Sequence, residues 1–447
     1  MSERPLSAGE RFSQIAGAVT RILLQGAEKL AYDVTGLAVA LRRIGRAPDA
    51  AWQTEPARYL HQVYGQYYWR SPLAPLKCFV AALLWPPVFA LAVAGFTFVN
   101  GRAIAKRSGT SVLRQIGQQL AVGARHSIAP YWYYMYELYD DARRASAGLY
   151  LTAHETIGPA YSLMQPAAHV DYMADKVWFA DYCRRNNVRA VPVYALFSGG
   201  AARGDTGLSA DLPEEDLFVK LREGSGGHNT ERWDYLGNGR YRNSQGEIEN
   251  RTSLAARLMQ DSLKDDYIVQ PRLVNHRALA DFSNDALATA RILTCRNEEG
   301  DYEATNAAFR MAIGKNTVKD NFHSGGIATE VDLRTGVIGA ATNMGLTPGI
   351  GWREVHPVSG AQIAGRQLPN WQAALELACD AHRAFPERVV VGWDVAFLAD
   401  GPMIVEGNGK PDLDIHQRVE RRPAGAGRIA YLLAMNLHRA LTKIGAT

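Results

Sequence analysis

The stretch VVVGWDVAFLADGPMIVEGNGKPDLD, residues 389–414, is the strongest indication of fold in this chain. Apolar and β-branched residues lead to Asp400-Gly401, a typical two-residue hairpin turn, and a second apolar strand returns from it. Because side chains alternate faces along a strand, Glu406 and Asn408 share a face, and the turn brings Asp394 opposite them. Two carboxylates and an amide oxygen are ligands that Mg²⁺ prefers. The hairpin therefore predicts a magnesium site that also serves phosphate; the alternative is a surface hairpin with scattered polar residues.

The composition is that of a folded protein with 47% hydrophobic and 21% charged residues. Its 447 residues suffice for two or three domains. The net charge of +4, without a basic stripe of interleaved aromatics, argues against nucleic-acid binding. The four cysteines lie far apart without a C-x-x-C pair, which argues against a zinc site or disulfide framework. With no signal peptide predicted, we expect a cytoplasmic protein.

Helical periodicity dominates the first part of the chain, so residues 1–128 predict a mainly helical region. Residues 12–44 predict one or two amphipathic helices with basic flanks. Residues 79–99 contain no charge, but Pro86-Pro87 predicts a break in the middle. Two interpretations remain for this run. One is a re-entrant hairpin at the inner face of the cytoplasmic membrane, as in a peripheral or monotopic protein, and the other is a buried helical hairpin.

A glycine-rich loop follows a strand that ends in a lysine. The strand is 216–220, ending at Lys220, and the loop EGSGGH is 223–228. Glycines let backbone N–H groups approach phosphate oxygens, and the lysine adds a fixed positive charge. No G-K-[ST] ends the loop, so it is not a Walker A motif. Taken alone, the loop is more typical of a flexible surface segment, but together with the lysine strand and the downstream D…E-x-N hairpin it favours phosphate binding.

Other candidate cations are Lys176, which follows Asp175 at a predicted helix start, and Arg291 and Arg310 on predicted strands. Each arginine is suited either to clamp an anion or to form a structural ion pair. Residues 188–194 predict a further strand.

From about residue 130 to residue 414 the chain resembles the sugar-transfer-associated ATP-grasp family. The resemblance rests on the D…E-x-N hairpin, the V-K…G-S-G-G loop, the D-K pair at 175–176 and a D-N-x-x-x-G-G turn at 320–326. It implies an α+β ATP-grasp fold over residues 129–447, in which two α+β subdomains clamp the nucleotide. The hinge between these subdomains is expected near residues 266–272.

The resemblance also implies roles for particular residues. ATP phosphates are expected at the lysines and the glycine loop, and the adenine at the hinge, where Gln270 stands in place of the glutamate of many relatives. Mg²⁺, as two ions, is expected at the hairpin. The residues are Lys176, Lys220, Gly224, Ser225, Gly226, Gly227 and Gln270 for ATP, Asp394, Glu406 and Asn408 for the metal, and Arg310, Arg291 and Asn321 for catalysis.

The activity implied is ATP-dependent ligation of a carboxylate to an amine through an acyl phosphate, in surface-glycan or exopolysaccharide assembly. The substrates, a carboxylate and an amine acceptor, are expected to be glycan- or lipid-linked. Two alternatives stay open: a kinase of the same fold acting on a small molecule or glycan precursor, and a catalytically inactive ATP-binding scaffold at the membrane. No G-x-S-x-G elbow or paired Cys/His arrangement supports a covalent hydrolase.

Overall fold

The chain divides into two compact units, which we describe separately from a computed structural model. The first unit comprises residues 1–160, 345–349 and 421–434, and the second comprises 161–344, 350–420 and 435–447. The first unit thus extends past the predicted 1–128 region. The structure describes residues 51–68, 73–165, 172–204, 211–224, 229–282, 286–313, 322, 325–346 and 351–443. The helices predicted within 12–44 lie outside these residues.

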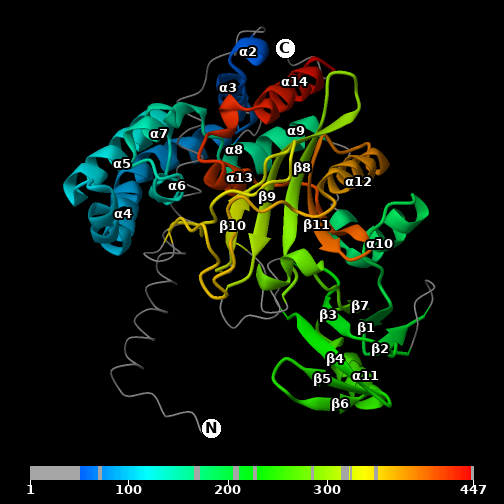
Figure 1. Ribbon diagram of the computed structural model, residues 1–447. Coiled ribbons are helices and arrows are strands. Elements are labelled where there is room, and N and C mark those ends of the chain that lie inside the picture. Colours follow the sequence, from blue (N-terminus) through cyan, green and yellow to red (C-terminus); the bar gives the residue numbers. More distant parts are fainter. Residues whose placement is uncertain are drawn as a thin grey trace. The chain divides into compact units, whose positions relative to one another are not determined.

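Helices make up the described secondary structure of the first unit, as predicted for the N-terminal region (Figure 1). They are α2 (Ala51–Thr54), α3 (Pro56–Tyr68), α4 (Ala74–Ser108), α5 (Val112–His126), α6 (Pro130–Met135), α7 (Asp141–Ala145), η1 (Ala147–Leu149), α8 (Ala153–Glu155), η2 (Thr156–Ala160) and η7 (Ala424–Ala426). The last helix, α14 (Arg428–Lys443), begins in this unit and ends in the second.

The longest helix, α4, runs through both prolines without interruption. The break predicted at Pro86-Pro87 is therefore wrong, and so are both hairpins that depended on it. Each proline removes one backbone donor, but both side chains are exposed, so their rings meet no packed neighbour. The hydrogen bonds of the turns on either side suffice to carry the helix past them.

Helices α4 and α5 pack closely because a glycine faces an aromatic ring. A Cβ on Gly123 of α5 would lie 2.2 Å from Cζ of Phe89 on α4. Buried amides add polar contacts to this interface. Gln119 donates from Nε2 to Thr97 Oγ1 at 2.8 Å, and Gln115 donates from Nε2 to the Gly101 carbonyl at 2.9 Å. The pair is thus fixed by shape and by hydrogen bonds at once.

A seven-stranded antiparallel sheet forms one half of the second unit, with strand order β2-β1-β7-β3-β4-β5-β6. Its core packs against α11 (Arg251–Asp261), whose N-cap Asn250 accepts from Ser253 N at 2.9 Å. The strands are β1 (Ala195–Ser198), β2 (Ala201–Arg203), β3 (Leu217–Leu221), β4 (Glu231–Gly237), β5 (Arg240–Asn243), β6 (Ile248–Asn250) and β7 (Tyr267–Pro271).

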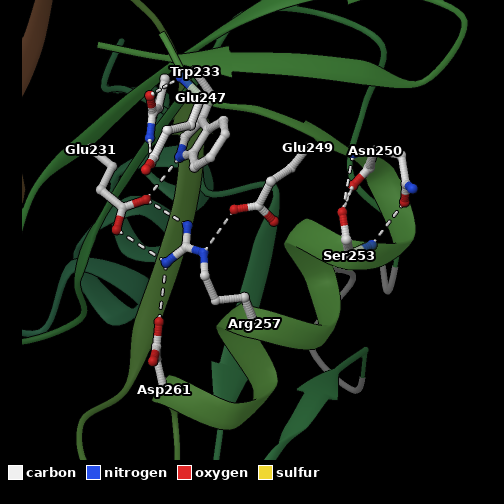
Figure 2. A network of polar contacts seen from close by, with 9 residues as sticks. Glu231, Trp233, Glu247, Glu249, Asn250, Ser253, Arg257 and Asp261 are labelled. Atoms are coloured by element: carbon white, nitrogen blue, oxygen red, sulfur yellow. Dashed lines mark hydrogen bonds and ion pairs between the residues drawn. The ribbon is translucent and has the colours of Figure 1, made fainter. Parts of the chain in front are cut away.

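Arg257 ties α11 to this sheet, and Figure 2 shows its guanidinium among three carboxylates. It bonds Glu231 on β4 through both oxygens, at 2.6 and 3.1 Å. It also bonds Glu249 on β6 at 3.2 Å and Asp261 at 3.1 Å. One side chain therefore connects two strands to the helix that covers them.

A five-stranded antiparallel sheet forms the other half, in the order β10-β9-β8-β11-β12. The predicted hairpin is present as its last two strands. The strands are β8 (Thr289–Arg296), β9 (Tyr302–Met311), β10 (Ile327–Glu330), β11 (Val390–Leu398) and β12 (Gly401–Asn408).

Alternate residues of β9 face different helices. Phe309 belongs to the core that contains Trp371 of α12 (Trp371–Ala384), whereas Asn306 donates to Glu420 at the end of α13 (Asp414–Val419). Because strand side chains alternate, α12 and α13 cover opposite faces of the sheet. The face under α13 carries the charged residues described below.

Residues 188–194, predicted as a strand, are irregular apart from one bridge between Ala190 and Ile404, and β1 begins only at Ala195. Pro192 has no N–H to give to a ladder, which explains the difference. The remaining helical elements are α9 (Tyr161–Met164), η4 (Tyr172–Ala174), α10 (Lys176–Arg185) and η5 (Arg277–Phe282).

Candidate functional site

A row of charged residues crosses three neighbouring strands of the five-stranded sheet. Asp394 on β11 is the register partner of Arg291 on β8 and of Glu406 on β12. Asn408, one alternation further along β12, is the partner of Gly392. Register partners share a face, so the four polar side chains lie together. The register shifts directly after Asp394, which confines this row to one end of the hairpin.

Two arginines hold the carboxylate of Asp394. Arg291 donates from Nη2 to Oδ2 at 3.0 Å, and Arg310 Nη2 lies 2.9 Å from the same oxygen. Thr289 accepts from Arg310 Nη2 at 2.6 Å and so fixes that guanidinium. Burial would raise the pKa of Asp394, but the two guanidiniums outweigh it and lower the pKa. Asp394 is therefore ionised at neutral pH.

Glu406 and Asn408 offer oxygens to a metal. Among the residues described, the carboxylate of Glu406 has no hydrogen-bond or ion-pair partner. Asn408 donates from Nδ2 to the Gly392 carbonyl at 3.3 Å, which leaves its Oδ1 as an acceptor. Asp394 carries further hard oxygens, which Arg291 and Arg310 hold in this structure. This donor set fits Mg²⁺, which prefers carboxylate and amide oxygens together with phosphate.

Lys176 is positioned by the start of α10. Asp175 caps this helix and accepts two hydrogen bonds from Arg222, from Nε at 3.0 Å and from Nη2 at 2.6 Å. This link places Lys176 Nζ 3.0 Å from the carbonyl oxygen of Gly224, which has a φ of 144° that favours glycine. Burial lowers the pKa of Lys176, and nearby acids, Glu406 foremost, oppose that effect. The lysine thus lies at the beginning of the glycine loop.

Lys220, on the seven-stranded sheet, interacts electrostatically with acidic residues of the five-stranded sheet. It lies on β3 of the seven-stranded sheet and is buried. Its ammonium group has no hydrogen-bond or ion-pair partner within the described part of the chain. Burial lowers its pKa to about 8, and the like charge of Lys176 acts in the same direction, while Glu406 and Asp394 act against it. A buried cation without a fixed partner is suited to receive an anionic group from a ligand.

Gln270 is buried on β7 and is the register partner of Phe218 on β3. Its strand lies next to that of Lys220, on the path from one sheet to the other. Ser225, Gly226, Gly227 and Asn321 lie outside the described residues. The structure therefore brings together Lys176, Lys220, Arg291, Arg310, Asp394, Glu406 and Asn408, with Gly224 at the edge of this group.

Sequence reasoning missed two residues of this group. Thr289 was detectable, because it shares the face of Arg291 two positions away on β8. His416 of α13 lies close enough to Arg291, Arg310 and Asp394 to feel their charges. No pattern in the chain marked it, since its helix is short and follows an irregular segment.

A surface hollow of about 830 Å³ lies elsewhere in the second unit. Arg334, Asn370 and Trp371 contribute to its lining at the start of α12. None of the predicted site residues lines it.

Comparison with solved structures finds ligases at low identity. An L-amino acid ligase from Bacillus licheniformis is 12% identical, with a TM-score of 0.29, over 54% of this chain and 41% of that one. VanG D-Ala:D-Ser ligase from Enterococcus faecalis is 12% identical, with a TM-score of 0.34, over 62% of each chain. The D-alanine-D-alanine ligase from Coxiella burnetii is 10% identical, with a TM-score of 0.34, over 65% of this chain and 68% of that one. The chain thus spans less than two thirds of the first two structures.

A comparison with curated proteins finds no match. A family model, that of the sugar-transfer associated ATP-grasp proteins, matches residues 160–424, which is more than half of the chain. This region contains both sheets and every predicted site residue. The predicted ATP-grasp fold, preceded by a helical region, is confirmed, and the chain belongs to the sugar-transfer associated ATP-grasp family.

Proposed function

We propose that the protein is an ATP-dependent carboxylate–amine ligase that works through an acyl phosphate. The observation that carries this proposal is the row Arg291, Asp394, Glu406, to which Lys220 of the other sheet is coupled by charge. Alternating cations and acids on one face can hold a polyphosphate together with its metal. Membership of the ATP-grasp family supports ATP as the nucleotide.

In the first step, a carboxylate oxygen of the acid substrate attacks the γ-phosphorus, and the bond to the leaving ADP breaks. Lys176, Lys220 and the loop at 224–227 hold the phosphates. Arg310, with Arg291 and Asn321, balances the charge of the transferred phosphoryl group. Asp394, Glu406 and Asn408 would hold Mg²⁺, as two ions, which supplies charge neutralisation between the phosphates.

In the second step, the amine nitrogen forms a bond to the acyl carbon as the bond from that carbon to the phosphate oxygen breaks. Inorganic phosphate leaves, and one amine proton is lost to solvent. The protein contributes positioning and charge, which suffice for both steps without a covalent enzyme intermediate. The products are an amide, ADP and phosphate.

We assign the two substrates to surface-glycan or exopolysaccharide assembly. The support is the description of the family as associated with sugar transfer. The acid or the amine would then be carried by a glycan or by its lipid-linked precursor. Both steps would take place at the cytoplasmic side of the membrane.

Nucleotide binding is tested by thermal unfolding with Mg-ATP. The wild type should gain several degrees, because a ligand that binds only the folded state stabilises it by mass action. Glu406→Ala should lose most of this gain, while its unfolding without ligand stays near that of the wild type. Glu376→Ala, at an exposed position on α12, is the matched control and should keep the full gain. An equal gain in Glu406→Ala would contradict the assignment.

Ligation is tested by ATP turnover with a panel of amino acids and glycan carboxylates, each with and without amines. A ligase should release ADP and phosphate and give an amide by mass spectrometry. ADP release with a stable phosphorylated product and no requirement for an amine would identify a kinase instead. Binding of Mg-ATP without turnover across the panel would leave an inactive scaffold.

Membrane contact is the second part of the proposal and rests on α4. Large apolar side chains along this helix are exposed, with Leu83 63% and Leu91 71% accessible. The helix is long and apolar enough to cross a membrane, and only a minor share of its apolar window is buried. Lys77 lies before the uncharged stretch, and Lys106 follows it. Such a surface is suited to anionic lipid.

Flotation with phosphatidylglycerol-containing vesicles tests this contact. The wild type should float with the vesicles, whereas Leu83→Asp should reduce the floating fraction several-fold, because a carboxylate resists transfer into hydrocarbon. Leu263→Asp in the second unit is the matched control, since Leu263 is 62% exposed, against 63% for Leu83. Full recovery of the wild type in the unbound fraction would refute membrane contact.

A further inference from the structure

Polar atoms without partners gather beside the charged row, on the segment that follows β12. Both ring nitrogens of His416 are buried without a hydrogen-bond partner among the described residues, and so is Oδ1 of Asp412. His416 is 1% exposed, whereas Asp412 keeps part of its surface in solvent. An unpaired buried polar atom destabilises the folded state, so folded proteins rarely retain several in one place.

These atoms lie next to the arginines to which the proposed function assigns the acyl phosphate. Asp412 is close enough to Arg291 to raise its pKa, and His416 is close to both Arg291 and Arg310. A second unpaired oxygen, Oδ1 of Asn306, lies on β9 under α13. Its amide Nδ2 already donates to Glu420 at 2.6 Å, so the orientation of this side chain is fixed.

The hydrogen-bonding capacity of the unpaired atoms indicates which kind of ligand they can bind. Asp412 and Asn306 offer oxygens that only accept hydrogen bonds, and a neutral imidazole offers one acceptor and one donor. His416 stays neutral because burial, with the charges of Arg291 and Arg310, lowers its pKa to about 3, and Asp394 offsets this only in part. Acceptors therefore predominate among these three side chains, and their one charge is the carboxylate of Asp412. Arg291 and Arg310, whose charges also act here, are paired with Asp394. A group rich in N–H donors, and positively charged in water, matches this arrangement.

We propose that Asp412 and His416 form the subsite for the amine acceptor, with Asp412 attracting the ammonium group and His416 accepting one of its hydrogen bonds. This inference rests on the proposed ligase function and names the class of its second substrate, a primary amine. The ammonium group would reach the partly exposed Asp412 first and would lose one proton to solvent before its nitrogen attacks. Bound there, its nitrogen would lie on the side of Arg291 and Arg310, where the acyl carbon is expected.

The test is a titration of the full chain, ¹⁵N-labelled at histidine, with glycinamide in the presence of Mg-ADP. The ring signals of His416, assigned by their loss in His416→Asn, should shift on addition of glycinamide. Glycolamide, in which a hydroxyl replaces the amine, should shift them at concentrations at least about tenfold higher, because it carries no charge for Asp412. Equal responses to the two compounds, or none to glycinamide, would overturn the proposal.

Asp412→Asn removes the charge at a partly exposed position and should fold even if the His416 variant does not. It should weaken glycinamide binding about tenfold, whereas Asp265→Asn at an exposed position should not change it. Unchanged binding in Asp412→Asn would also overturn the proposal.

The proposed function is measured separately, as hydroxamate formed from hydroxylamine, ATP and the acid panel, which needs only the acyl phosphate. If hydroxamate forms but glycinamide causes no shift, the ligase proposal is supported and the amine subsite is refuted. If glycinamide causes a selective shift but no hydroxamate forms, the amine site is supported and the ligase proposal is refuted.

Discussion

At the scale of single residues, the charge of Lys220 should make nucleotide binding depend on pH. Its pKa of about 8, lowered chiefly by burial, places the loss of its charge within an accessible range. Affinity for ADP, measured in EDTA by calorimetry, should fall by about fivefold between pH 8 and 9 as the ammonium is lost. Lys220→Arg should keep its affinity over this range, because a guanidinium stays charged. A wild type whose affinity is constant from pH 7 to 9.5 would show that Lys220 does not contact the phosphates.

The same lysine affects folding in the opposite direction. Its pKa is lower in the folded chain than in the unfolded one, so the unfolded chain binds more protons between about pH 8 and pH 10.5. The contribution of Lys220 to the free energy of unfolding should therefore rise with pH in this window. Chemical denaturation should show that Lys220→Met gains stability over the wild type at pH 7, and that the gain shrinks by pH 10.

The sequence identified the polar residues of the β11–β12 hairpin that lie opposite one another, but it did not identify the arginines that pair with them. Alternation along two strands and a recognisable turn suffice to place Asp394 opposite Glu406. The pairing of Asp394 with Arg291 and Arg310 depends on which distant strands become neighbours, and no local pattern encodes that choice. His416 was missed for the same reason, because its neighbours come from strands far away in the chain.

At the scale of elements, the contact between α4 and α5 depends on one of two glycines in α5. A Cβ on Gly123 would collide with the ring of Phe89, which is itself buried and stacked on Trp85 with ring centroids 4.7 Å apart. Gly123→Ala should lower the free energy of unfolding by about 1–3 kcal/mol, as overpacking does. Urea denaturation followed by circular dichroism measures it.

Gly117 supplies the control in the same helix. A Cβ there would meet nothing within 4 Å, and the residue is exposed. Gly117→Ala should therefore raise the free energy of unfolding by about 0.5–1 kcal/mol, through helix propensity alone. Destabilisation of equal size in both variants would mean that the close approach to Phe89 does not set the packing.

Helix α11 offers a comparable test on the seven-stranded sheet. Arg257→Met should lower the free energy of unfolding by about 1–2 kcal/mol, because three partly exposed carboxylates lose their shared partner (Figure 2). The loss should shrink at high salt, which already screens these charges. Arg240→Met, at an exposed position on β5, should change little. A loss that does not depend on salt would point to packing of the arginine on Trp233 instead.

Strand and turn patterns predicted strands of the second unit correctly, whereas the expectation that proline ends a helix gave a wrong prediction for the first unit. Strand β3 was predicted from the run that ends at Lys220, and strands β11 and β12 from apolar runs on either side of the Asp400-Gly401 turn. Helix α4 shows the limit of a local rule, since two prolines did not end a helix that continues on both sides of them. Proline was decisive only near residue 192, where a donor was needed for a ladder.

At the scale of the whole molecule, the two proposed activities belong to different units. Every described residue assigned to the nucleotide lies in the second unit, and the exposed apolar surface of α4 lies in the first. Hydrogen exchange of the full chain should separate them. Mg-ADP should slow exchange in the edge strand β12 and around residues 222–224, and leave α4 unchanged, because ligand contacts suppress local opening. Anionic vesicles should do the reverse, slowing exchange in residues 74–91 and leaving β12 unchanged. Protection of β12 by vesicles alone would mean that lipid reaches the site directly, and the separation of the two activities would have to be abandoned.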